Sequence, residues 1–188
     1  MRAVLGAVVV WLAATMTLSA QNTDTAAWSK IGAWQIRVDR TAGDGCFAMA
    51  SYQRGTVTRL GVDVNSNALY ILFGHSDWKS LEAGRVYPVR VVFDGVKSYD
   101  GEMRGQQLAN TVFLAHRHLS SAFVKDFMER NGIEVFYRGA LLASLSLKDS
   151  YAAVKAVMDC QREFGFAKSR PHNDPFAGAS PVNKDPFR

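Results

Sequence analysis

The sequence predicts an α+β fold, mainly an antiparallel β-sandwich or a partly open barrel, with two helices packed on it near the C-terminus. Before residue 116, apolar side chains recur every second position in short runs that turn residues separate. After residue 116, two segments carry apolar stripes at helical spacing, and each follows a capping residue. A long apolar stretch at the N-terminus adds an expectation about where the domain works.

The expected strands are short runs, either alternating or continuously apolar. In the first, Trp34, Ile36 and Val38 alternate with polar residues, which is the pattern of a half-buried strand. Turn residues bound each of the others. These cover 46–52, 56–64, 68–73, 86–93, 112–115, 133–137 and 140–147.

Two helices are expected, one inside and one after the last strands. Ser120 or Ser121 can cap the first helix, which would run through Asn131 and stop at Gly132. Asp149 or Ser150 can cap the second. The apolar faces expected are Ala122, Phe123, Phe127 and Met128 on the first helix, and Tyr151, Val154, Val157 and Met158 on the second.

Residues 1–20 have the layout of a secretory signal peptide. Arg2 precedes an uncharged apolar run that ends at small residues. An uncleaved membrane anchor is the alternative, but the polar residues before Asp24 favour cleavage. We therefore expect a periplasmic or secreted protein with no stable membrane insertion after cleavage.

The mature chain divides into three parts by composition. Residues 21–30 are small and polar, which predicts a flexible start, and 31–164 form a single α+β domain. Residues 165–188 carry prolines among polar residues, which predicts a disordered tail. The tail repeats Asp-Pro-Phe at 174–176 and 185–187, and these repeats could instead act as binding anchors.

Two cysteines, Cys46 and Cys160, are expected to form one disulfide in an oxidising compartment. A free or intermolecular thiol and a catalytic thiol are the alternatives, and the absence of a C-x-x-C spacing disfavours a redox pair. Loss of Arg2 with the signal peptide lowers the net charge from +5 to +4, and the charges are dispersed. We therefore expect no nucleic-acid partner.

No motif carries a recognisable chemistry. His116 and His118 could share one strand face, with His75 and Asp77 completing a metal set, but the four-ligand spacing of a structural zinc site is missing. We therefore predict no metal and no cofactor.

Signatures of catalysis are also missing, and no catalytic residues are assigned. The chain has no G-x-S-x-G motif. Asp94 and Asp100 each precede glycine, and together with Glu102 they are interpreted as loop acids. The sequence therefore favours a non-catalytic protein over an enzyme.

Two segments carry a resemblance to a known family. The stretch 31–38 (IGAWQIRV), followed by a turn and Cys46, resembles the opening of the invasion-associated-locus-B-like family of exported bacterial proteins. The stretch 144–148 (SLSLK), followed by Ala152 and Ala153, is similar as well. The resemblance implies a β-rich, non-enzymatic, exported module. The middle of this chain departs from the family because further family cysteines are missing.

The leading functional hypothesis is an exported periplasmic module that binds a protein or cell-envelope component. A periplasmic inhibitor of a lysozyme-like hydrolase, an enzyme of unrecognised type and a structural envelope protein are the alternatives. Binding is predicted in the long 74–87 connection, led by His75, Trp78 and Tyr87, because recognition residues accumulate on loops held by a rigid sheet. The competing interpretation is that Trp78 covers the end of the core.

Overall fold

The structure, a computed structural model, describes residues 24–169 of the chain, with side chains to Phe164. The predicted signal peptide and most of the predicted tail lie outside this range. The strands are β1 (Thr25–Ile31), β2 (Trp34–Asp39), β3 (Gly45–Ser51), β4 (Thr56–Asp63), β5 (Ala68–His75), β6 (Val86–Phe93), β7 (Lys97–Leu108), β8 (Thr111–Arg117), β9 (Gly132–Tyr137) and β10 (Ala140–Ser146). The helices are α1 (Ser121–Glu129) and α2 (Ser150–Ser169), with 3-10 turns η1 (Arg40–Ala42) and η2 (Gln53–Gly55).

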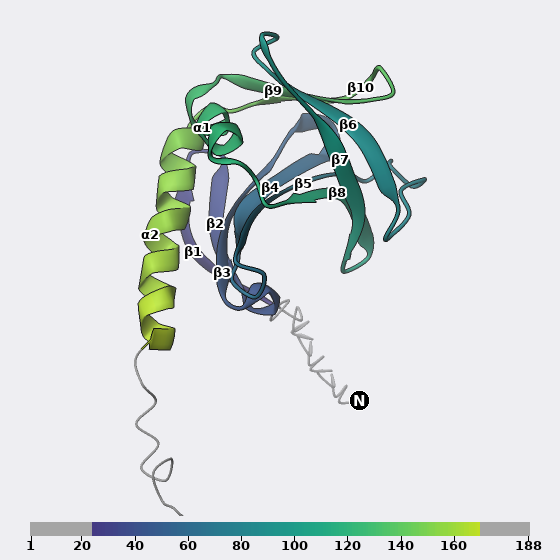
Figure 1. Ribbon diagram of the computed structural model, residues 1–188. Coiled ribbons are helices and arrows are strands. Elements are labelled where there is room, and N and C mark those ends of the chain that lie inside the picture. Colours follow the sequence, from purple (N-terminus) through teal and green to yellow (C-terminus); the bar gives the residue numbers. More distant parts are fainter. Residues whose placement is uncertain (1–23, 170–188) are drawn as a thin grey trace, which may run out of the picture.

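The strands form one antiparallel sheet in the order β1-β2-β3-β4-β5-β8-β7-β6-β9-β10. The sheet curls around its own interior but does not close, so β1 and β10 are its two margins (Figure 1). This arrangement confirms the predicted fold class. Of the two architectures that the sequence left open, the structure has the partly open barrel.

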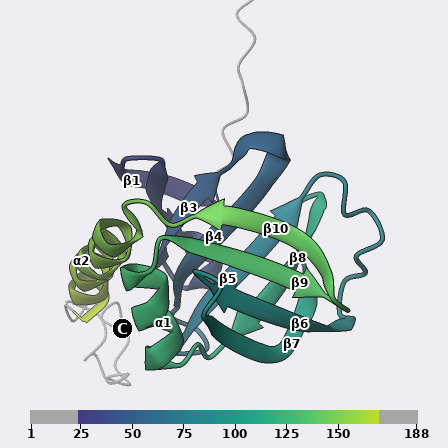
Figure 2. The same ribbon diagram turned by 90° about the horizontal axis from the view of Figure 1, so that it is seen from above.

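Both helices cover one end of the curled sheet (Figure 2). Helix α2 contacts strands β1 to β4, and α1 packs against α2. The ring of Phe127 on α1 meets the ring of Trp34 on β2 edge to face, with centroids 5.7 Å apart. Side chains from the inner face of the sheet and from both helices therefore share one main core. Neither helix combines the length and the apolar character that crossing a bilayer requires.

Strand β1 lies where the sequence predicted a flexible start. Its residues pair with β2 from Thr25 opposite Asp39 to Ile31 opposite Trp34. Trp28 packs against the core, and its Nε1 donates a hydrogen bond to Glu163 on α2 at 3.2 Å. Small and polar residues give this strand no clear apolar pattern, so the sequence did not predict it. Its order comes from pairing with β2 and packing against α2.

Strand β7 is the second element absent from the sequence prediction. Asp100-Gly101, expected as a turn, lies inside it, with Asp100 opposite Arg90 of β6. Asp94-Gly95 does form the expected turn, with φ of 49° and 70°. The interpretation of Asp100 and Glu102 as loop acids is therefore wrong: both lie on a strand, because pairing with β6 and β8 overrides the local turn preference.

The helices follow the prediction with three changes. Ser120 caps α1, its hydroxyl accepting from the Phe123 amide at 3.2 Å, but α1 ends at Glu129 and Ala122 is exposed. On α2, Tyr151 is 56% exposed and lies outside the buried face that Val154 and Val157 belong to. Ala122 and Tyr151 both lie in the first turn of their helices, where helical periodicity is least reliable as a guide to burial.

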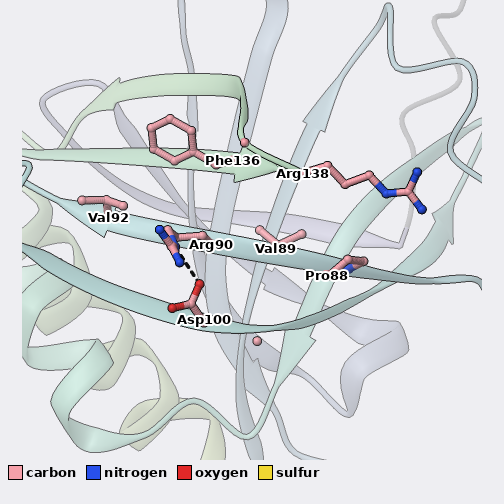
Figure 3. A pocket seen from close by; sticks show the side chains of 9 residues that line it. Pro88, Val89, Arg90, Val92, Asp100, Phe136 and Arg138 are labelled. Atoms are coloured by element: carbon pink, nitrogen blue, oxygen red, sulfur yellow. Dashed lines mark hydrogen bonds and ion pairs between the residues drawn. The ribbon is translucent and has the colours of Figure 1, made fainter.

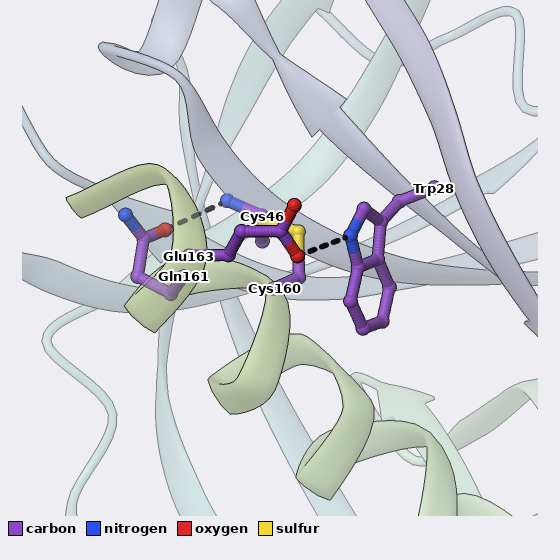
Figure 4. Close-up of a disulfide and its surroundings, with 5 residues drawn as sticks. All are labelled: Trp28, Cys46, Cys160, Gln161 and Glu163. Carbon is purple, nitrogen blue, oxygen red and sulfur yellow. Dashed lines mark hydrogen bonds between the residues drawn. A yellow bond between two sulfur atoms is a disulfide. The ribbon is translucent and has the colours of Figure 1, made fainter. Parts of the chain in front are cut away.

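The predicted disulfide is present. Cys46 of β3 bonds Cys160 of α2 across a sequence separation of 114, with Cα atoms 6.1 Å apart. Beside it, the Cys46 amide donates to the side-chain oxygen of Gln161 at 2.8 Å, and Trp28 reaches Glu163 (Figure 4). The bond and its neighbours attach the last helix to the sheet.

Candidate functional site

A cleft of about 350 Å³ opens at the end of the sheet away from the helices. The connection between β5 and β6 forms one wall with the start of β6, and β8, β9 and β10 contribute the rest. The lining residues are Asp77, Trp78, Ser80, Leu81, Arg85, Tyr87, Leu114, Tyr137 and Leu142. We call this the end cleft. It contains two of the three predicted binding residues, Trp78 and Tyr87.

Backbone hydrogen bonds hold the β5–β6 connection in place. Gly84 N donates to Gly105 O at 2.7 Å, and Gly105 N donates to Arg85 O at 2.8 Å, so the end of the connection is bound to β7. A Cβ at Gly105 would lie 2.1 Å from the carbonyl oxygen of Glu82, which only glycine avoids. The connection is therefore a positioned wall of the cleft.

Trp78 has two contacts that bear on its role. It is half-buried and packs against the main core, and its ring stacks on His75 with centroids 5.9 Å apart. The same ring lines the end cleft. Trp78 thus covers the end of the core and also presents a surface to the cleft.

Tyr87 and His75 are less accessible than a free loop would make them. Tyr87 is 6% exposed, its ring meets Tyr137 edge to face at 5.9 Å, and its hydroxyl accepts from the Glu82 amide at 2.8 Å. His75 accepts at Nδ1 from the Asp77 amide at 3.0 Å. Tyr87 is therefore a fixed part of the cleft wall, while the ring of His75 stacks on the ring of Trp78.

Sequence reasoning did not find the far wall of the cleft. Leu114, Tyr137 and Leu142 belong to strands β8, β9 and β10, which are distant in the chain. Leu142 reaches the cleft where the β9–β10 register shifts between Leu141 and Ala143. Only the pairing of the strands brings these side chains to the loop, and the sequence carries no signal for that bulge.

The walls of the end cleft are aromatic and aliphatic, and its charged groups are Asp77 and Arg85. Arg85 donates to Glu82 at 2.6 Å, and this bond with the carboxylate charge raises the pKa of Arg85, which stays cationic. Such a site suits the insertion of an apolar or aromatic group, with the charges orienting its polar end.

A second, smaller cavity of about 140 Å³ is strongly polar. Arg59 lies over the ring of Phe47, with its guanidinium carbon 3.5 Å from the centroid, and pairs with Asp39. Arg117 pairs with Asp63 at the same cavity. Each carboxylate at this cavity is paired with an arginine, so the positive and negative charges of the ion-pair network balance.

The network shifts the pKa of several groups. Burial opposes ionisation of Asp39, but hydrogen bonds from Arg59 and Thr41 and the Arg59 charge outweigh it and lower its pKa. Asp63 behaves alike, with Ser66 and Arg117 lowering its pKa against the effect of burial. Burial raises the pKa of Tyr70 to about 12, although Arg59 opposes the shift.

The histidines considered for a metal do not come together. His116 lies opposite Ile71 on β5, and His75 lies four residues further along that strand, roughly 13 Å away at strand spacing. His116 contacts the carbonyl of Glu102 at 2.9 Å, and His118 is exposed. Within residues 24–164, no three His, Cys, Asp or Glu side chains form a group that could hold a metal ion.

No protein-family model matches the chain, and no curated protein matches its sequence. Among solved structures, it is similar to invasion associated protein B from Bartonella henselae, with a TM-score of 0.52. The two are 12% identical, and the match covers 71% of this chain and 97% of that one. At this identity the likeness shows a shared fold. The family resemblance seen in the sequence is thereby supported at the level of architecture.

Proposed function

We propose that the protein is an exported, non-catalytic module that binds a partner protein of the cell envelope through the end cleft. The observation that carries the proposal is a cleft with aromatic walls, built from Trp78, Tyr87 and Tyr137 and held rigid by the sheet. Aromatic side chains provide contact area at low entropic cost, and a fixed wall avoids the cost of ordering a loop on binding.

Export is supported by two features. The disulfide between Cys46 and Cys160 is of the kind that persists in oxidising compartments. The sequence of residues 1–20 has the layout of a signal peptide.

Site-specific photocrosslinking in the exporting bacterium tests the proposal. A photoreactive residue at Ser80 would lie in the cleft wall, and one at Tyr151 would lie on exposed α2 as the control. We expect a discrete crosslinked partner from position 80 that position 151 does not give. Equal products from both positions, or none from position 80, would contradict the proposal.

Substitution of Trp78 by alanine separates binding from stability. Because Trp78 is half-buried, we expect a loss of about 2 kcal/mol in the free energy of unfolding, roughly half that of a fully buried Trp. We also expect at least tenfold weaker binding of the crosslinked partner. Trp28→Ala is the matched control, since Trp28 is half-buried at the opposite end and should lose stability alone. Intact binding by folded Trp78→Ala would end the claim for this cleft.

A further inference from the structure

We propose that the free edge of β10 accepts an extended segment of a partner protein as an eleventh strand of the sheet. This inference rests on the proposed function, and it specifies how the partner binds. Among the described residues, it combines three features of the same corner of the molecule: a strand edge that no other strand pairs with, a row on the outer face that ends in the apolar residues Phe136 and Leu141, and an arginine, Arg138, with no acidic partner.

Strand β10 pairs only with β9 within the part of the chain that the structure describes. Its seven residues, Ala140–Ser146, include no charge and no proline. Natural edge strands are usually protected by charges, prolines or covering elements, because unpaired backbone groups recruit other strands. The register shift after Leu141 leaves the rest of the strand, Ala143 to Ser146, in regular pairing with β9.

The opposite margin of the sheet is protected in the way that β10 is not. Both margins have a register shift, but β10 carries no charge, whereas strand β1 carries Lys30. Helix α2 packs against it, and Trp28 bonds Glu163 on that helix. The contrast between the two margins singles out β10 as the edge available for pairing.

A row of side chains crosses the outer face of the sheet and ends at this edge. Asp100 lies opposite Arg90, Arg90 opposite Phe136, and Phe136 opposite Leu141. Leu141 is 53% exposed and Phe136 is half-buried. A groove of about 560 Å³ runs over this face, and Figure 3 shows Phe136 and Val92 beside the Arg90–Asp100 ion pair. An added strand would continue the row with an apolar residue next to Leu141.

Arg138 gives the site a charge preference. It lies at the β9–β10 turn, exposed, over the ring of Tyr137 at 5.2 Å, and no acidic side chain within residues 24–164 pairs with it. Arg90, in contrast, already has Asp100 at 2.7 Å. The segment that fits is therefore extended and apolar in alternation, with an Asp or Glu near Arg138.

A second copy of this chain fits the edge less well than an extended segment. Seven residues span about 23 Å, and two barrels joined along one such line diverge on both sides of it. A stable dimer usually buries about 800 Å² per partner, which a single strand pair between convex walls does not provide. A separate segment can pair with β10 and reach the end cleft at Leu142 without bringing two barrels together.

Selection from a random twelve-residue peptide library displayed on phage, against the folded mature protein, tests the inference. We expect selected peptides with alternating apolar residues and an acid. Their binding should slow hydrogen exchange of the amides of residues 140–146. A proline in the middle of a selected peptide should abolish binding, since proline cannot donate to a strand ladder.

Variants of the protein locate the site. Leu141→Lys and Ser144→Lys place a charge on the exposed outer side of β10, and each should weaken peptide binding at least tenfold. Gln35→Lys is the matched control, because Gln35 is exposed on β2 and pairs with β1 on one side and β3 on the other, so peptide binding should be unchanged.

Three results would overturn strand addition. The first is that no peptides are selected. The second is that peptide binding depends on Trp78 but not on Leu141. In both cases, a partner crosslinked at Ser80 would still support the end cleft as a binding site. The third is a wild-type dimer in sedimentation that Leu141→Lys dissociates, which would make a second copy the occupant.

Discussion

At the scale of single residues, the most unusual feature is that two ion pairs on the outer face of the sheet each contain a buried aspartate. Asp39 and Asp63 are buried to 5% and 7% exposure, and each is paired with an arginine. Buried charges are tolerated only when they are paired and hydrogen-bonded. The stacking of Arg59 on Phe47 and its bond to the Tyr70 hydroxyl meet this condition.

Asp39→Asn is expected to lower the free energy of unfolding by about 3 kcal/mol at neutral pH, because it leaves Arg59 partly buried without its counter-charge. The folded-state pKa of Asp39 lies below 3.8, so the stabilisation from its charge is present above about pH 4 and is lost as the pH falls through the folded pKa. Urea unfolding at a series of pH values is the measurement. The difference between wild type and variant should shrink below pH 4, and a constant difference would show that the charge of Asp39 is not its cause.

At the scale of elements, α2 is the part whose position depends most on one covalent bond. Its buried residues Ala153, Val154 and Val157 face the sheet, and Cys160 joins it to β3. The helix follows the last strand in the chain but packs on the first four, so the contact closes nearly the whole domain into one loop.

Cys160→Ser should destabilise the fold without changing it. The chain-entropy model gives roughly 5 kcal/mol for a loop of this length, since the bond restricts the unfolded chain. Thermal unfolding of the variant, followed by circular dichroism, should show a lower Tm and the same folded spectrum. Cys46→Ser serves as the parallel control. A Tm equal to that of the oxidised wild type would contradict the stabilising role of the bond.

At the scale of the whole molecule, the curled sheet has two unlike ends and two unlike margins. The helices cover one end, and the β5–β6 connection with Trp78 covers the other. Margin β1 is covered by α2, while β10 pairs only with β9 among residues 24–169. The candidate binding features all lie at the end and margin that the helices do not cover.

Hydrogen exchange should reflect this asymmetry. Amides of β5, which pairs with β4 along its length and with β8 from Tyr70 to Phe73, should be among the slowest to exchange. Amides of β10 should exchange faster, because no strand of the described part of the chain pairs with its outer edge. Mass spectrometry of peptides covering 68–75 and 140–146 measures both. Equal protection of the two segments would mean that another part of the chain covers β10.

Sequence reasoning succeeded where local pattern and packing agree. The alternation at Trp34, Ile36 and Val38, the capping hydroxyl of Ser120 and the paired cysteines each carry a local or compositional signal. It failed at β1 and β7, where polar and small residues form strands only because neighbours pair with them. Of the end cleft, the sequence indicated Trp78 and Tyr87 but not Tyr137 or Leu142.

The sequence by itself therefore determined the class of fold, the disulfide, and one wall of the candidate site, because these follow from periodicity, cysteine count and loop composition. Only the tertiary structure decided which strands meet, which margin stays open, and that Tyr87 is a buried wall and not an exposed anchor. Strand order in a long antiparallel sheet depends on contacts between segments far apart in the chain. Forming these contacts costs loop-closure entropy, and the burial of apolar surface offsets that cost only when the whole domain is assembled.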